Sequence, residues 1–216
     1  MFNFFSKNKI FKYRLKYSKG MTYVELIVVL SIFSIMSSIV IFNYGKFQQN
    51  LDIKNLSGDI ALKVLQAQKF SISGKLPSIT QQQLIADNGL GGINAWKPSY
   101  GIFFDILTPT TFTYFTDVNL NSIYDASWGE FNEIININNN MKILKIEAGG
   151  GSCSSPVEIE ELTVVFKRPN SGAIITTVPS PLSCVEEYIN ITVSPTSDTT
   201  KTAIIKVYTS GRIEIR

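Results

Sequence analysis

Two hydrophobic patterns follow each other without a break in the first 74 residues. Residues 21–41 are apolar on every side, interrupted by hydroxyl residues and by a single acid, Glu25. A helix rises about 1.5 Å per residue, so about 20 such residues cross the roughly 30 Å hydrocarbon core of a bilayer. We therefore predict a transmembrane helix over residues 21–44.

From residue 45 the pattern becomes amphipathic. Large apolar residues recur at steps of four or five, while charged residues lie on the other faces. The stripe consists of Phe47, Leu51, Leu56, Ile60 and Val64, widened by Leu65 and Ala67. Residues 22–73 contain no Pro, and Gly74 is followed by Pro77, which together favour one long helix that stops at Gly74. This predicts that residues 45–74 continue the helix and pack on a globular head.

The pattern changes to period two beyond Pro98. Residues 74–98 are rich in Gln, Gly and Asn and predict a connecting loop with one short helical turn near 81–85. Alternating apolar and polar residues after that predict strands over 100–106, 111–115, 142–147, 162–166, 174–177, 188–193, 203–208 and 212–215. The expected fold class is α+β, with a long N-terminal helix packed on an antiparallel, β-rich head over residues 75–216.

Charge is concentrated at the N-terminus. Residues 1–20 hold six of the 20 basic residues and no acid, which marks a cytoplasmic leader by the positive-inside rule. Without this leader, 14 basic residues face 17 acidic ones, so the formal charge of +3 would become about −3. A general attraction to nucleic acid therefore depends on the leader alone.

The junction between the leader and the apolar run has the sequence Lys19-Gly20-Met21-Thr22-Tyr23-Val24-Glu25-Leu26. A secretory signal peptide has a shorter apolar region, and a plain signal anchor would explain the length but neither Gly20 nor Glu25. The junction resembles the N-terminal signature of type IV prepilins and pseudopilins. The resemblance implies that prepilin peptidase cuts after Gly20 and methylates Met21. It also implies that Glu25 meets the amino terminus of a neighbouring subunit during assembly.

Looser similarities in the head, such as residues 100–105, 163–169 and 210–213, resemble minor pilins or H-type pseudopilins. The resemblance implies a structural subunit of a type IV pilus or type II secretion pseudopilus, not an enzyme. Its partners would be prepilin peptidase, other pilin or pseudopilin subunits, the inner-membrane assembly platform and membrane lipid. The subunit would cross the bacterial inner membrane once before assembly, with its head outside the cytoplasm.

The side-chain inventory limits the chemistry of the head. His is absent, which removes Ser-His-Asp and Cys-His arrangements and the commonest zinc ligand. The chain has two cysteines, Cys153 and Cys184. In an exported domain they are expected to form a disulfide, the alternative being two buried thiols. Gly149–Gly151 lacks the Lys-Ser/Thr of a phosphate loop and predicts a flexible loop ahead of Cys153.

Residues 117–125 place side-chain oxygens at alternate positions, as the start of a Ca²⁺ loop does. The candidate ligands are Asp117, Asn119, Asn121 and Asp125. Against this, Ser122 stands where the EF-hand pattern has Gly, position twelve is Trp128, and Glu130 comes two residues late. Asp and Asn also favour ordinary turns, so a Ca²⁺ site and a polar turn both remain open.

Arg212 and Arg216 follow Gly211 at the C-terminus and faintly resemble the basic motif of DNA-binding minor pilins of competence pili. That resemblance implies DNA as an alternative partner. In a strand, however, the two arginines share a face with Glu214, which predicts a local salt-bridged surface instead.

Overall fold

The computed structural model describes residues 20–89, 98–137, 140–178 and 184–216. The chain divides into two compact units, Met1–Gly45 and Lys46–Arg216. Helix α1 (Tyr23–Ser73) contributes to both units. The second unit therefore contains the predicted head and also the helical residues from 46 onward.

In the first unit, α1 begins where Thr22 caps it. The Thr22 hydroxyl accepts a hydrogen bond from the Glu25 amide at 3.2 Å. Farther along, Ser31 and Ser34 donate their hydroxyls to the carbonyls of Ile27 and Leu30, so these polar groups are satisfied within the helix. Within the described part of the chain, α1 is the one helix long and apolar enough to cross a membrane.

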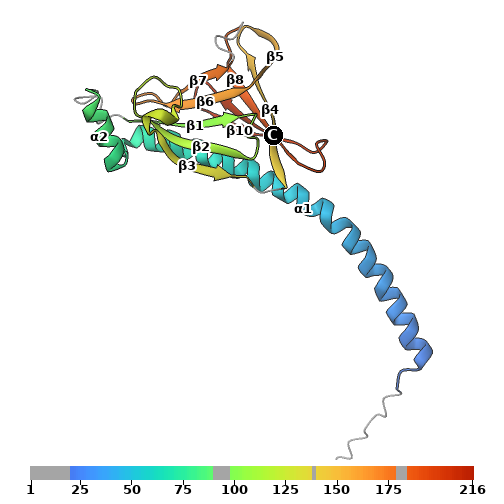
Figure 1. The fold of residues 1–216 in the computed structure, drawn as a ribbon. Coiled ribbons are helices and arrows are strands. Elements are labelled where there is room, and N and C mark those ends of the chain that lie inside the picture. The colour runs from blue at the N-terminus through green and yellow to red at the C-terminus, as the bar shows by residue number, and fades with distance from the viewer. Residues whose placement is uncertain (1–19, 90–97, 138–139, 179–183) are drawn as a thin grey trace, which may run out of the picture. The chain divides into compact units, whose positions relative to one another are not determined.

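The second unit contains two five-stranded antiparallel sheets (Figure 1). The first has the order β3-β2-β1-β6-β7 and the second the order β10-β9-β8-β4-β5. The strands of the first sheet are β1 (Ser99–Asp105), β2 (Thr111–Asp117), β3 (Phe131–Asn136), β6 (Glu161–Phe166) and β7 (Ala173–Val178). Those of the second are β4 (Met141–Gly150), β5 (Cys153–Ile159), β8 (Tyr188–Pro195), β9 (Ala203–Tyr208) and β10 (Ile213–Ile215).

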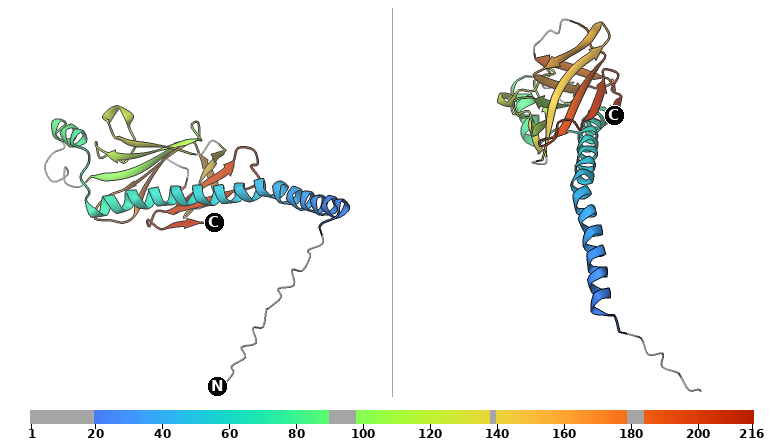
Figure 2. Two further views of the ribbon diagram at one scale, coloured as in Figure 1. Left: turned by 90° about the horizontal axis from the view of Figure 1, so that it is seen from below. Right: turned by 90° about the vertical axis from the view of Figure 1, so that its right-hand side faces the viewer.

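One hydrophobic core joins both sheets to the second half of α1, which lies along the strands in Figure 2. The helix contributes Ile53, Leu56, Ile60, Ala61, Val64 and Ala67 to this core. The predicted stripe is confirmed at Leu56, Ile60, Val64 and Ala67. It is wrong at Phe47 and Leu51, which are 59% and 38% exposed. Leu65 is also exposed. It lies five residues after the buried Ile60, and in a helix of 3.6 residues per turn a step of five leads away from the buried face.

The strand prediction is confirmed for β1, β2, β4 and β6–β10, but β3 and β5 were missed. Both missed strands are sheet edges and most of their residues are at least partly exposed, so they show no apolar alternation. The predicted short helical turn is α2 (Ile79–Asp87), which begins with a capping box between Ser78 and Gln81. The predicted stop at Gly74 is confirmed, since Gly74 follows the last residue of α1 with a φ of +65°.

Candidate functional site

The predicted processing residues lie together at the start of the described chain. Gly20 and Met21 precede α1 in non-helical backbone and are exposed, and Glu25 lies in the first turn. Glu25 is the only charged residue between Gly20 and Lys46. Cleavage, methylation and subunit pairing stay predictions, but the three residues are adjacent and accessible as those steps require.

The part of α1 in the second unit also exposes an apolar face. Leu62 is 64% exposed, while Leu65 and Ile72 are each 45% exposed. Leu65 and Ile72 line a shallow surface groove along the helix together with Gln68 and Lys69. The helix thus has one face in the core of its own unit and a second apolar face open to solvent.

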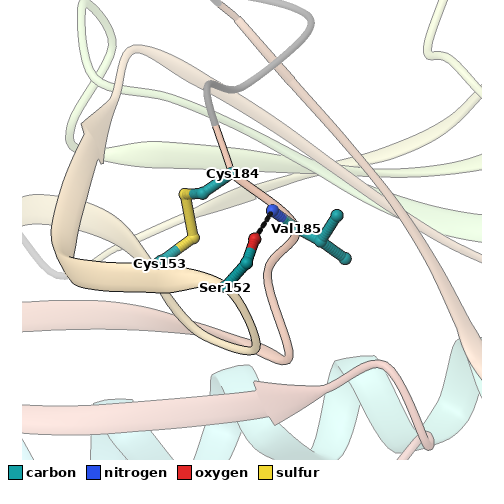
Figure 3. Close-up of a disulfide and its surroundings, with 4 residues drawn as sticks. All are labelled: Ser152, Cys153, Cys184 and Val185. Atoms are coloured by element: carbon teal, nitrogen blue, oxygen red, sulfur yellow. Dashed lines mark hydrogen bonds between the residues drawn. A yellow bond between two sulfur atoms is a disulfide. The ribbon is translucent and has the colours of Figure 1, made fainter.

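The predicted disulfide is confirmed. Cys153 at the start of β5 is bonded to Cys184, which precedes β8, with an S–S distance of 2.00 Å (Figure 3). Beside the bond, Ser152 accepts a hydrogen bond from the Val185 amide at 2.8 Å and donates its own amide to the Val185 carbonyl at 3.0 Å. The two cysteines therefore sit on segments that are already hydrogen-bonded to each other.

The flexible loop predicted for the glycine run is wrong. Gly149 and Gly150 end β4, and Gly150 pairs with Cys153 across a tight hairpin turn. Gly150 and Gly151 have φ values of +77° and +60°, which residues with a Cβ rarely adopt. The glycines therefore form the end of β4 and the turn of a β-hairpin, and β5 rather than a helix begins after them.

The four predicted Ca²⁺ ligands fall at the end of β2 and in the connection to β3, residues 118–130, which we term the β2–β3 loop. Asp117 Oδ2 accepts from the Ser122 amide at 3.2 Å. Asn119 and Asn121 accept from the amides two residues onward, at 3.0 and 2.7 Å. Asp125 accepts from both the amide and the hydroxyl of Ser127. These bonds are those of a polar turn and involve side-chain oxygens that a cation would also use, but Oδ1 of Asp117 takes part in none of them.

Glu130 is the residue that sequence reasoning placed outside the pattern, yet it holds the loop together. Its Oε1 accepts from the amides of Val118 and Asn119, at 3.1 and 3.3 Å. Its Oε2 accepts from the Asp125 amide at 2.7 Å. The short 3₁₀ helix Ala126–Trp128 lies between Asp125 and Glu130 and shortens the distance that this segment spans. The Glu130 carboxylate can therefore reach the loop although it comes two residues later than the EF-hand pattern requires.

The loop is fixed against the outer face of the first sheet. The Tyr124 ring packs against Phe103 and Phe115, with ring centroids 5.0 and 5.2 Å apart. On β7, Thr176 donates its hydroxyl to the Ser122 carbonyl at 3.2 Å. The loop therefore extends across the sheet from β2 to β7. The ring contacts of Tyr124 and the hydrogen bond from Thr176 hold it there.

Burial dominates the electrostatics of this loop. Asp117 is 1% exposed and Glu130 is fully buried. Burial raises the pKa of Asp117, although amides of the loop and Lys167 act in the opposite direction. Burial also raises the pKa of Glu130 to about 7, and the nearby Asp117 charge adds to this shift. The site thus holds two carboxyl groups that resist ionising together.

Arg212 and Arg216 flank β10 and both pair with Glu214, at 3.9 and 3.2 Å. The pairing with Glu214 is the local salt-bridged surface that the sequence predicts. Arg216 also borders a hollow between α1 and β9 whose other basic lining residues are Lys54 and Lys201. DNA binding stays a prediction, since no nucleic-acid contact follows from these positions alone.

Among the residues that the structure describes, no three His, Cys, Asp or Glu side chains stand together as a ready metal cluster. Comparisons with protein-family models, with curated proteins and with solved structures found no match.

Proposed function

We propose that this chain is a structural minor subunit of a type IV pilus or type II secretion pseudopilus. Prepilin peptidase would cut it after Gly20, and the subunit would assemble through α1. Before assembly it would cross the bacterial inner membrane once, with the Lys46–Arg216 unit outside the cytoplasm. Its partners would be the peptidase, neighbouring subunits and the inner-membrane assembly platform.

The observation that carries this proposal is the make-up of α1. One continuous helix, Tyr23–Ser73, begins three residues after Gly20. Its residues up to 45 are apolar except for hydroxyls, Asn43, Gly45 and the single carboxylate of Glu25. A solitary signal anchor needs the apolar length, whereas an acid in its first turn would bring it only the modest helix-dipole stabilisation of about 0.3–1 kcal/mol.

Energetics support an assembly role for Glu25. On insertion scales a charged side chain costs about 2.5–3.5 kcal/mol at the centre of a membrane helix unless a partner compensates it, and Glu25 in the first turn would incur a part of this cost that depends on its depth. Cleavage after Gly20 would create an amino terminus on Met21, and in a neighbouring subunit this cation could pair with Glu25. Such pairing would favour assembly and set the axial stagger between helices.

The exposed apolar face of α1 in the second unit supports the same role. Leu62, Leu65 and Ile72 lie on the helix but outside the core of their own unit. A neighbouring helix that covered them would remove apolar surface from water at about 25 cal/mol per Å². The helix is thus suited to contacts between subunits both at its acid and along its length.

Crosslinking tests the proposal in the full chain, in membranes of a bacterium that has the peptidase and the assembly platform. A Ser38→Cys reporter, on an exposed position of α1, is oxidised to trap neighbouring helices. We expect crosslinked subunits with Glu25 present and at least a severalfold loss in Glu25→Ala, with insertion and cleavage unchanged.

Asp59→Ala provides the matched control, since Asp59 is an exposed carboxylate of the same helix in the second unit. It should leave the crosslinks at the wild-type level. Equal crosslinking in wild type and Glu25→Ala would remove the proposed role of the carboxylate. A mature N-terminus at Met1 by mass spectrometry would contradict the processing step.

A further inference from the structure

The β2–β3 loop buries two carboxylates, Asp117 and Glu130, and Lys167 acts on Asp117 only from beyond ion-pair distance. Oδ1 of Asp117 is buried and accepts no hydrogen bond, although the other oxygen of the same group is tied to the Ser122 amide. Among the described residues, the ion pairs do not include Asp117 or Glu130. Buried carboxylates are normally paired or bound to metal. We propose that this loop, closed by Glu130, is a Ca²⁺ site.

The donors have the chemistry that Ca²⁺ requires. This ion takes about six to eight oxygen ligands from carboxylates, Asn side chains and main-chain carbonyls. The proposed donors are the side-chain oxygens of Asp117, Asn119, Asn121, Asp125 and Glu130, together with the main-chain carbonyl of Ile123. Each of these oxygens has more than one lone pair, so an oxygen that accepts an amide can also face a cation.

The backbone of the loop already has the turn that such a site needs. Leu120 and Ser122 have φ values of +62° and +65°, in the left-handed region that favours Gly. Ser122 is the sixth position of the loop, where the EF-hand pattern has Gly for its sharp turn. Ser122 therefore has the left-handed backbone conformation that Gly provides in the EF-hand loop, although its side chain makes this conformation less favourable.

Glu130 supplies the closing carboxylate despite its late place in the sequence. Its two oxygens contact amides at both ends of the loop, those of Val118 and Asn119 on one side and Asp125 on the other. Asp117, Asp125 and Glu130 do not stand close enough together to hold an ion by themselves. Binding consequently requires the half-exposed Asp125 carboxylate to leave Ser127 and turn toward the other two.

The test uses the full chain in detergent after removal of divalent ions. Tb³⁺, a luminescent substitute for Ca²⁺, is added, and its emission is excited through the aromatic residues of the loop, Tyr124 and Trp128. We expect saturable emission that Ca²⁺ at or below about 1 mM displaces and that equal Mg²⁺ does not, because Mg²⁺ demands a smaller and stricter octahedral site. Saturating Ca²⁺ should also raise the unfolding temperature by several degrees over chelator.

Two variants separate a metal site from a purely structural turn. Asp117→Asn should weaken Ca²⁺ displacement of Tb³⁺ at least about tenfold. Ser122→Gly should tighten it, because Gly adopts the left-handed turn without strain. A purely structural loop would gain the same stability from Ser122→Gly with and without Ca²⁺.

Asp105→Asn is the matched control. Asp105 closes the β1–β2 turn by accepting from the Leu107 amide at 2.7 Å, so the substitution removes a similar turn carboxylate elsewhere. It should leave Ca²⁺ binding unchanged. The proposal is overturned if wild type shows no saturable emission, if Asp117→Asn binds like wild type, or if only protons and not Ca²⁺ stabilise the chain.

Discussion

The burial of Ile60 gives the sharpest test of which face of α1 packs into the core of the second unit. Ile60 is fully buried in the core that contains both sheets, whereas Leu62, two residues along the same helix, is 64% exposed. We therefore predict opposite outcomes for Ile60→Ala and Leu62→Ala. Both changes leave Ala, the residue of highest helix propensity, so a difference between them reports packing rather than helix formation.

The magnitude follows from the burial of each side chain. Ile→Ala removes three carbons at about 0.8 kcal/mol each and leaves a cavity, for a total of about 3 kcal/mol within the usual range of about 2–5. In a unit of this size, each kcal/mol lowers the unfolding temperature by about 2–4 °C, so Ile60→Ala should lower it by about 6–12 °C. Leu62→Ala should change the stability by less than about 0.5 kcal/mol, as exposed substitutions usually do.

Thermal unfolding of the full chain in detergent, followed by near-ultraviolet circular dichroism, measures this difference. The signal comes from packed aromatic rings, and the second unit contains several, including Phe104 with Phe112 and Tyr100 with Tyr114. Equal losses in the two variants, or a larger loss in Leu62→Ala, would refute the assignment of the buried helix face.

Three further predictions concern processing, the disulfide and pH. Gly20→Val should leave the full-length precursor in the membrane, visible as an unshifted band on gels and an N-terminus at Met1; normal cleavage would contradict the role of Gly20. Cys184→Ser should lower stability by roughly 3–4 kcal/mol, since the bond closes a sequence separation of 31 residues, and a melting temperature equal to that of oxidised wild type would argue against this. In chelator, the free energy of unfolding should fall by up to about 3 kcal/mol as pH rises from 4.5 to about 7, because folded Glu130 keeps its proton over this window and the unfolded chain loses it. Glu130→Gln should flatten that slope in denaturant titrations, although Asp117 adds a contribution of the same sign; a stability that rises with pH here would show the pKa direction to be wrong.

Local patterns determined α1, the confirmed strands and the α+β class. The apolar run has no Pro and continues directly into an amphipathic stretch, which favours one long helix. In a bilayer, a helix satisfies the hydrogen bonds of all its backbone N–H and C=O groups within itself. The interior strands β1, β6 and β8 bury alternate or continuous apolar residues, and this pattern is visible in the sequence. The edge strands β3 and β5 lacked such a pattern, because an edge strand with little burial needs no apolar face.

Only the tertiary structure decided which distant residues meet. The sequence suggested that Cys153 and Cys184 pair, but their approach depends on the pairing of β4 with both β5 and β8. The sequence likewise put Glu130 two residues out of register with the Ca²⁺ pattern. The 3₁₀ helix Ala126–Trp128 and the pairing of β2 with β3 bring its carboxylate back to the loop. Spacing along the chain predicts contacts only while the backbone stays regular, and a turn that absorbs extra residues can restore a contact that spacing alone rejects.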